Sequence, residues 1–437
     1  MSLSYVLGIV VLVVGIGLSV ALHELGHMIP AKLFGVKVPE YFIGFGPRLW
    51  SVTRGETEYG VKAIWLGGYV RLVGMLPPAR PGHPDRRRKD GSPGMVAQAR
   101  AEALEEIGPG EEDRAFYRLT VPRKLLVMAG GILTNLVLGI LLLAAAVSAV
   151  GVPTYTSTLA SVAPCVPADV TASVCSDTDP ASPAAQAGLR AGDTVISWDG
   201  IPVEGWADVQ DAIADAGTTT VPVVVERDGA ESTLQVTATQ VERIVYDAEG
   251  NAEAGDDGQV LTAKRAYVGI SPALGTQRQS VTVLPTILAD AVGQTLRAIA
   301  TLPVGLYHVV AAGLGLEDRS ASGVIGLVGM GRMAGEVSSA GGSAVPFSAR
   351  LYSMLALLGS LNLALFAFNL LPFLPLDGGH VAGALWEGIR RRRAKAKGLP
   401  DPGPVDTARM LPVGQVVFYL LIAMALVLVW ADIVAPV

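Results

Sequence analysis

The sequence has little charge: Asp, Glu, Lys and Arg make up only 16% of its 437 residues, where a typical soluble domain carries about 25%. This shortage disfavours an ordinary soluble enzyme. Only two cysteines are present, which excludes a disulfide-rich framework. Hydrophobic residues make up 51% of the chain, too many for a disordered protein. The net charge of −6 disfavours a general nucleic-acid binder, so we expect no nucleic-acid partner.

What the chain does have is long uncharged apolar runs, each long enough to cross about 30 Å of hydrocarbon at about 1.5 Å per residue. The runs are Leu3–Leu22, Leu125–Pro153, Leu351–Leu376 and Met410–Ala431. A single run could be a buried helix of a soluble protein, but four runs in one chain disfavour that explanation. We therefore predict an α-helical polytopic membrane protein. Its four transmembrane helices are expected at 3–33, 123–150, 350–376 and 410–432.

The distribution of charge predicts the orientation of these spans. Basic residues concentrate in 37–124 and 387–411, which predicts that both segments are cytoplasmic. The segment 154–349 is acidic on balance, most clearly in the Asp- and Glu-rich stretch 246–258, and is predicted to be extracytoplasmic. Both chain ends then lie outside as well. The first run has no Lys or Arg before Lys32, so we interpret it as a span rather than a signal peptide.

Between the first two spans, residues 41–75 look like β-structure. The β-rich runs Tyr59–Trp65 and Gly68–Val73 lie on either side of Gly67-Gly68, which predicts a β-hairpin that turns at these glycines. The glycine-broken stretch Phe42–Pro47 is typical of a turn.

Three further segments complete the predicted organisation. Residues 77–118 are rich in Pro, Gly and charge and predict a flexible cytoplasmic loop. Residues 155–275 predict an inserted α+β domain. Residues 281–345 have helical periodicity and few charges, which predicts an amphipathic segment on the membrane surface. Cys165 and Cys175 lie in the outer part of the chain, where either a short-loop disulfide or two free thiols is consistent with the sequence.

The strongest chemical signal is His23-Glu24-Leu25-Gly26-His27 in the first span. Residues i and i+4 share a helix face, so both imidazoles can reach one Zn²⁺, and Glu24 is placed to act as a general base. His23 lies about 14 Å along a helix from Lys32, which places the site inside the bilayer near its cytoplasmic side. A fortuitous pair of histidines is the alternative, but ionisable residues at that depth are functional by default.

A catalytic zinc site needs a third protein ligand. Asp377 closes a run with no charge since Arg350, and Pro372 and Pro375 break the helix before it. We predict Asp377 as the third ligand. The alternatives are that Asp377 is a plain helix cap or turn residue, and that His380 binds the metal in its place.

These motifs resemble those of the site-2 protease family, peptidase family M50. The resemblance rests on HExxH in the first span, Gly131-Ile-Leu-Thr-Asn135 in the second and Asn369-x-x-Pro-x-x-Pro-Leu-Asp-Gly in the third. The segment Ala187–Ile196 is similar to part of a PDZ domain, so the chain resembles the bacterial regulator-of-sigma-E-type proteases with a single PDZ domain at 155–275. It departs from many members in having Gly131 where they have Gly-Pro.

The resemblance implies the membrane protease core to be split between 1–150 and 350–437, in the bacterial inner (plasma) membrane. It implies one Zn²⁺ per chain, with ligands His23, His27 and Asp377 and with Glu24 as the catalytic base. It implies that the β-hairpin at 59–73 is membrane-associated, enters the membrane and presents an edge to the substrate. The substrate-binding residues it suggests are Gly67, Gly68, Tyr69, Asn135 and Asn369, although Asn135 could equally serve helix packing. The PDZ residues it suggests are Gly188, Leu189, Gly192 and Asp193.

We therefore expect an intramembrane zinc metalloprotease. By family analogy its substrates are single-span proteins already trimmed outside by a site-1-type protease, such as anti-sigma factors and remnant signal peptides. One alternative is a metal-binding PDZ scaffold in the bilayer without proteolysis, which would not need Glu24. Another is a zinc transporter, which would need more intramembrane His, Asp or Glu than the second and fourth spans offer.

Overall fold

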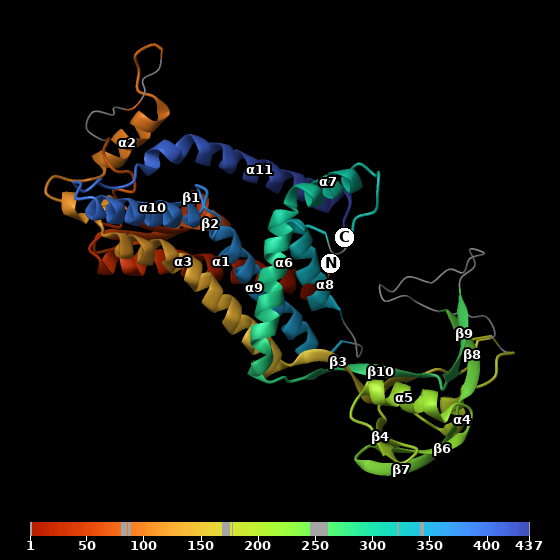
Figure 1. Ribbon diagram of the computed structural model, residues 1–437. Coiled ribbons are helices and arrows are strands. Elements are labelled where there is room, and N and C mark those ends of the chain that lie inside the picture. The colour runs from red at the N-terminus through yellow and green to blue at the C-terminus, as the bar shows by residue number, and fades with distance from the viewer. Residues whose placement is uncertain are drawn as a thin grey trace. The chain divides into compact units, whose positions relative to one another are not determined.

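A computed structural model describes residues 2–79, 85, 89–167, 175–176, 178–244, 261–320, 323–340 and 345–436 (Figure 1). The chain divides into two compact units. The first contains Met1–Ala149, Ser280–Ala340 and Ser353–Val437, and the second contains Val150–Gln279 and Gly341–Tyr352. The predicted acidic stretch 246–258 lies outside the described residues.

Four helical segments are long and apolar enough to cross a membrane, or five if a bent helix pair is counted as one span. The four are α1 (Leu3–Leu33), α3 (Val121–Ala144) with the π-helical turn Ala145–Val150, α9 (Phe347–Asn369), and α11 (Leu411–Val434) with the 3₁₀ turn Thr407–Met410. The bent pair is α6 (Leu284–Ala300) and α7 (Leu302–Gly313), which meet at 72°. The architecture is compatible with the predicted polytopic membrane protein.

The third predicted span ends earlier than expected, at Asn369 rather than 376. Residues 370–376 are not helical, and α10 (Asp377–Ala396) begins directly after them. Pro372 and Pro375 explain the break, because proline lacks the N–H that a helix interior requires. The helix α10, much of which lies in the predicted cytoplasmic segment 387–411, therefore starts at the predicted ligand Asp377.

The predicted β-structure at 41–75 is present, but the predicted position of its turn is wrong. The strands β1 (Glu40–Arg54) and β2 (Thr57–Arg71) connect through Gly55-Glu56, and Gly67-Gly68 lies inside β2. The stretch 42–47 is strand rather than turn, and Gly44 and Gly46 bend it with φ near +85°. The bend lets β1 pair with β2 at two places. The β-ribbon, as we call the structure formed by β1 and β2, therefore folds back on itself.

The register shows which segment forms the edge of this ribbon. The C-terminal part of β1 pairs with the start of β2, from Arg54↔Thr57 to Trp50↔Val61. The N-terminal part of β1, residues 40–43, pairs both with residues 58–61 and with residues 68–71 of β2. Among the described residues, 68–71 has β1 as its only strand neighbour. This segment is therefore an edge.

The described part of the loop 77–118 is more ordered than predicted. It contains α2 (Met95–Glu105) and the 3₁₀ turns Glu112–Arg114 and Phe116–Arg118. The buried side chain of Arg100 on α2 bonds to Asp85 and to Asp406, and also to the carbonyl of Pro77. Composition did not indicate this order because the Arg100–Asp406 pair joins residues more than 300 positions apart.

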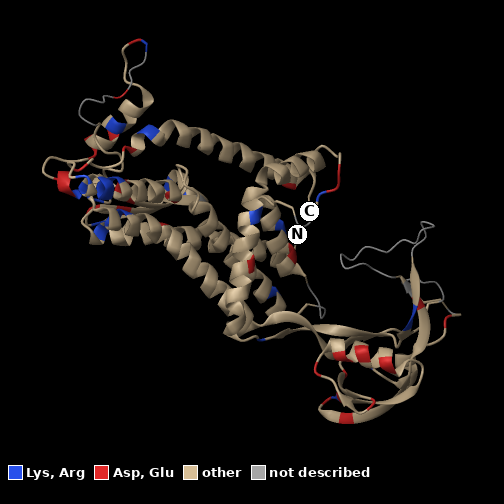
Figure 2. Ribbon diagram, in the orientation of Figure 1, with Lys and Arg blue, Asp and Glu red and all other residues tan. Residues whose placement is uncertain are grey.

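Charge is unevenly distributed over the first unit. In the ribbon of Figure 2 the Lys and Arg positions gather on α10, on and near α2 and at the start of α3, while α9 and most of α11 carry almost none. The helix α8 (Leu327–Ser339) packs closely on α1: a Cβ on Gly8 would lie 2.3 Å from the carbonyl oxygen of Ala334. The described part of 281–345 is thus largely helical, and its last helix contacts the first span.

The second unit is a mixed α+β fold built on an antiparallel sheet with strand order β10-β3-β4-β6-β7 and with β5 on β4. Its core gathers Trp198, Leu159 and a set of fully buried valines. The strands are β3 (Val152–Val162), β4 (Thr194–Trp198), β5 (Ile201–Pro202), β6 (Thr220–Arg227), β7 (Ala230–Thr237) and β10 (Ile270–Gln277), with a separate pair of β8 (Thr239–Ile244) and β9 (Thr262–Tyr267). The helices are α4 (Pro183–Ala187) and α5 (Trp206–Ala216).

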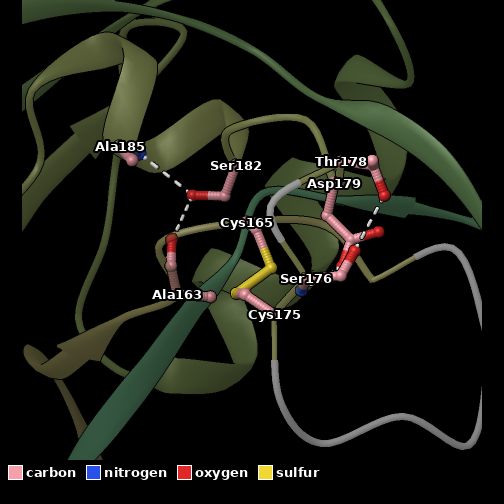
Figure 3. Close-up of a disulfide and its surroundings, with 8 residues drawn as sticks. All are labelled: Ala163, Cys165, Cys175, Ser176, Thr178, Asp179, Ser182 and Ala185. Atoms are coloured by element: carbon pink, nitrogen blue, oxygen red, sulfur yellow. Dashed lines mark hydrogen bonds between the residues drawn. A yellow bond between two sulfur atoms is a disulfide. The ribbon is translucent and has the colours of Figure 1, made fainter.

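Of the two possibilities left open for the cysteines, the structure contains the disulfide. Cys165 and Cys175 are joined, with their Cα atoms 6.0 Å apart (Figure 3). Beside the disulfide, Ser182 donates to the carbonyl of Ala163 and accepts from the N–H of Ala185 at 3.1 Å. The disulfide therefore joins the segment that follows β3 to the approach to α4.

Candidate active site

The site is built where α1 and α3 cross at the HExxH motif. A Cβ on Gly130 would lie 1.9 Å from the carbonyl oxygen of Gly26, so the two helix backbones are in direct contact. A Cβ on Gly131 would lie 2.2 Å from Nε2 of His27. Only glycine permits this approach, which lets α3 pack against the imidazole without displacing it.

Three side chains converge at this crossing. Nε2 of His27 lies 3.3 Å from Nε2 of His23, and Oδ2 of Asp377 lies 3.2 Å from each of them. All three side chains are mostly buried. They are the group of potential metal ligands found among the described residues.

This geometry fits a zinc ion. A tetrahedral ion about 2.0–2.2 Å from each ligand requires ligand atoms about 3.3–3.5 Å apart, close to the separations observed. His27 supports the fit, because its Nδ1 lies 2.8 Å from the carbonyl oxygen of Val127. Nδ1 therefore carries the proton and donates it, which leaves the lone pair of Nε2 directed at the centre. Nδ1 of His23 has no such partner among the described residues.

The positions of the side chains favour Asp377 over the alternatives for the third ligand. Asp377 is the first residue of α10, and its carboxylate faces the two histidines. His380 is one turn further along α10, where it lines a cavity of about 20 Å³ with Lys124 and Glu387, and it is not part of the three-residue group. Gly378 keeps the turn compact, because a Cβ there would lie 2.3 Å from the carbonyl oxygen of Leu371.

Glu24 lies between this centre and the edge of the β-ribbon. A Cβ on Gly68 would lie 3.2 Å from Cγ of Glu24 and 2.9 Å from Cγ1 of Val20. The backbone of Val70 also interacts with the Glu24 carboxyl group. The edge segment 68–71 thus runs beside the carboxylate, and glycine at 68 allows the approach. Gly67 serves a different contact, because its neighbour is the ring of Phe45.

The other predicted site residues are placed less specifically. Tyr69 donates to Glu40 at 2.7 Å and accepts from Lys62 at 2.9 Å, so its hydroxyl is engaged within the ribbon. Asn135 is buried on α3, and its Oδ1 has no partner among the described residues. Asn369 is the last residue of α9, at the start of the break.

Sequence reasoning missed a second buried asparagine. Nδ2 of Asn362 on α9 donates to Oγ of Ser19 at 3.0 Å, one turn before His23, and its Oδ1 is buried without a partner among the described residues. A polar residue inside an apolar run was the available signal. Such residues join membrane helices through hydrogen bonds.

The predicted PDZ residues lie in turns and in the core of the second unit. Gly188 and Gly192 have φ of +81° and +94°, and Leu189 is buried. The buried Asp193 pairs with Arg227 at 2.7 Å, which holds the pKa of Asp193 below its usual range. A groove of about 590 Å³ lies elsewhere, between α5 and residues 264–270.

Comparison with known proteins matches this arrangement to one family. The sequence profile of peptidase family M50 matches residues 11–399. The chain is 33% identical to zinc metalloprotease Rip1 of Mycobacterium tuberculosis (strain ATCC 25618 / H37Rv), over 99% of this chain and 98% of that protein. It is 30% identical to zinc metalloprotease Rip1 of Mycolicibacterium smegmatis, over 98% of both. It is 28% identical to metalloprotease MmpA of Caulobacter vibrioides, over 91% of this chain and 88% of that protein.

Proposed function

The chain belongs to peptidase family M50 and is a zinc metalloprotease, and from that premise we propose that it hydrolyses peptide bonds within transmembrane segments of single-span proteins already shortened outside. The observation that carries the proposal is the grouping of His23, His27 and Asp377 beside Glu24, on helices apolar enough to span a bilayer. We assign the first three as the zinc ligands and Glu24 as the catalytic base. Regulated intramembrane proteolysis of anti-sigma factors and removal of remnant signal peptides are the roles that family analogy supports.

The zinc site, Glu24 and the two asparagines have separate roles in the proposed hydrolysis. Bound zinc supplies Lewis-acid stabilisation of the charge that develops on the scissile carbonyl. Glu24 accepts the proton of the attacking water and later gives it to the leaving amine nitrogen as the C–N bond breaks. His27 is held in one tautomer by the Val127 carbonyl. Asn135 and Asn369 are candidates to donate hydrogen bonds to the unwound substrate or to the oxyanion.

Substrate presentation follows from the edge segment 68–71. A transmembrane helix satisfies its amides internally, so it must unwind before hydrolysis. An exposed strand edge re-satisfies these groups by strand addition. The edge runs beside Glu24, so a strand added there would lie within reach of the base. Gly68 and Tyr69 of this edge, with the preceding Gly67, are therefore proposed to bind substrate through the backbone.

The second unit is proposed to be a single PDZ domain that gates access by size or reads protein tails. Its antiparallel sheet and the groove between α5 and residues 264–270 support this assignment. The charge distribution supports cytoplasmic placement of α10 and α2. Both termini and the second unit then lie outside the inner (plasma) membrane.

The test is cleavage of a tagged single-span substrate with a shortened outer domain, reconstituted with wild type or with Glu24→Gln, with zinc content assayed in parallel. We expect wild type to cleave within the span, and Glu24→Gln to retain zinc and lose at least about 10³-fold in rate. Retained zinc with no cleavage of any substrate by wild type would support the scaffold alternative instead. A wild type without zinc would refute the ligand assignment.

A further inference from the structure

An apolar groove of about 400 Å³ lies in the first unit, outside the metal centre. One wall is α1, the other is α8, and the side chain of Trp65 on β2 also lines it. On the side of α8 the lining consists of Leu327, Val328, Gly331 and Arg332. Nothing in the chemistry assigned above uses this groove.

The groove occupies the face of α1 that carries the catalytic base. On α1 it is lined by Ile9, Val13 and Ile16 among others, and the series continues at the same three- and four-residue spacing to Val20 and Glu24. Residues at this spacing lie on one side of a helix.

Contacts along this face join the groove to the active site. A Cβ on Gly17 would lie 3.3 Å from the ring of Trp65, just beyond the groove. One turn further on, Gly68 lies against Val20 and Glu24. The groove therefore leads along α1 to the ribbon edge and the carboxylate.

Arg332 is the one charged residue among those that line the groove. It is half-buried, and no described residue forms an ion pair or hydrogen bond with its side chain. The wall that carries it is anchored: Asp432 of α11 accepts from the N–H of Gly329 at 2.7 Å and from Arg319 at 2.6 Å. A cation that has no partner among the described residues and lies beside membrane-spanning helices points to a function.

We infer that this groove binds the outer half of a substrate's transmembrane helix, and that Arg332 pairs with an Asp or Glu side chain at the outer flank of that helix. The inference rests on the proposed function. Charge complementarity selects an acidic partner, and the apolar lining selects a membrane helix. The α1 residues of the groove precede Glu24 by 8 to 19 positions, or roughly 12–28 Å along the helix. Pairing at Arg332 therefore sets which peptide bond reaches Glu24.

The experiment uses full-length enzyme in phosphatidylcholine nanodiscs and one trimmed single-span substrate in three versions, with Asp, Asn or Lys at the outer flank. If the outer end of the substrate is its C-terminus, each version is also made with an uncharged carboxamide in place of the terminal carboxylate. The enzymes are wild type, Arg332→Gln, Arg332→Glu and the control Arg297→Glu. Arg297 is exposed on α6 and does not line the groove. Zinc content and thermal unfolding are measured for each enzyme.

We expect wild type to prefer the Asp over the Lys substrate about tenfold in kcat/KM, mainly through KM, since about 1.4 kcal/mol corresponds to a factor of ten. Arg332→Gln should remove the preference, Arg332→Glu should reverse it, and Arg297→Glu should keep the wild-type order. The inference is overturned if Arg332→Glu slows all substrates equally or if Arg297→Glu has the same effect. It is also overturned if the carboxamide removes the preference, because the chain end is then the partner.

The two hypotheses fail in different ways. If the preference is absent while wild type cleaves and Glu24→Gln does not, only the role of Arg332 is wrong. If no version is cleaved by wild type, or if Glu24→Gln cleaves as well as wild type, the proposed function itself is wrong.

Discussion

In the first unit the helices α1 and α3 meet through the backbones of Gly26 and Gly130, whereas the second unit surrounds Trp198 with buried valines. The first unit also buries polar partners, including Lys124 with Glu387 at 2.8 Å and Asn362 with Ser19. Lipid offers no hydrophobic drive between helices, so small residues and polar pairs join them. Burial of apolar side chains away from water is favourable, so an apolar core stabilises the second unit. We therefore expect substitutions in the first unit to disturb the positions of side chains at the site, and substitutions in the second unit to lower its stability.

The largest effect is expected for Gly131→Ala. The added methyl group would lie 2.2 Å from Nε2 of His27, so it must displace a proposed ligand atom. We expect zinc affinity to fall by about 100-fold, at the upper end of the losses seen for altered ligand support, and cleavage to fall with it. Zinc titration of the purified variant measures this.

The matched control is Gly293→Ala on α6, where nothing lies within 4 Å of the new Cβ. It should bind zinc as wild type does. Normal zinc affinity in Gly131→Ala would mean that the helices separate easily, and that the glycine contact does not position His27.

A smaller effect, on stability rather than chemistry, is expected for Asp193→Asn in the second unit. Asp193 is buried and accepts hydrogen bonds from the partly exposed Arg227, so removing its charge should cost about 2.5 kcal/mol, within the range for hydrogen bonds to charged groups. Because pairing lowers the pKa of Asp193, its contribution is present above the unfolded pKa of about 3.9 and is lost as the pH falls through the folded pKa. The difference between the variant and wild type should therefore shrink below about pH 4.

Hydrogen exchange of the β4 and β6 amides in the full-length protein measures this difference. Exchange in α1 and α3 should stay at the wild-type rate, because zinc binding and helix packing do not use the pair. Equal protection of β4 and β6 in both proteins at neutral pH would show that the pair adds nothing to the stability of this unit.

The smallest effect is expected for the double variant Cys165→Ser/Cys175→Ser. The two cysteines are 10 residues apart, so the disulfide closes a short loop and its loss should cost about 2 kcal/mol in the second unit. Hydrogen exchange near β3 and α4 should rise, while cleavage of a trimmed substrate should stay within about twofold. A reducing agent should have the same effect on wild type and none on the variant; an effect of the reductant on the variant would assign the change to something other than the disulfide.

The sequence predicted the apolar spans and the pair His23 and His27 because both depend on local signals, namely the length of an apolar run and the i, i+4 spacing. Asp377 lies 350 positions from His27, and its prediction depended on its place after an uncharged run and on the family resemblance. The turn of the hairpin was predicted at the wrong position because glycine occurs both in turns and where two segments pack closely. Gly67 and Gly68 were interpreted as a turn, but Gly68 provides space for Glu24, and the turn is at Gly55. The order in 77–118 and the groove at Arg332 depend on contacts between distant segments, which no local pattern encodes.

The crossing at Gly26 and Gly130 has a mechanical consequence. Two backbones already in contact cannot approach further, and moving them apart would break the bond between His27 and the Val127 carbonyl. The pair α1–α3 is therefore a fixed part of the first unit. If the proposed function is right, a substrate helix must reach the site without any change in the spacing of α1 and α3.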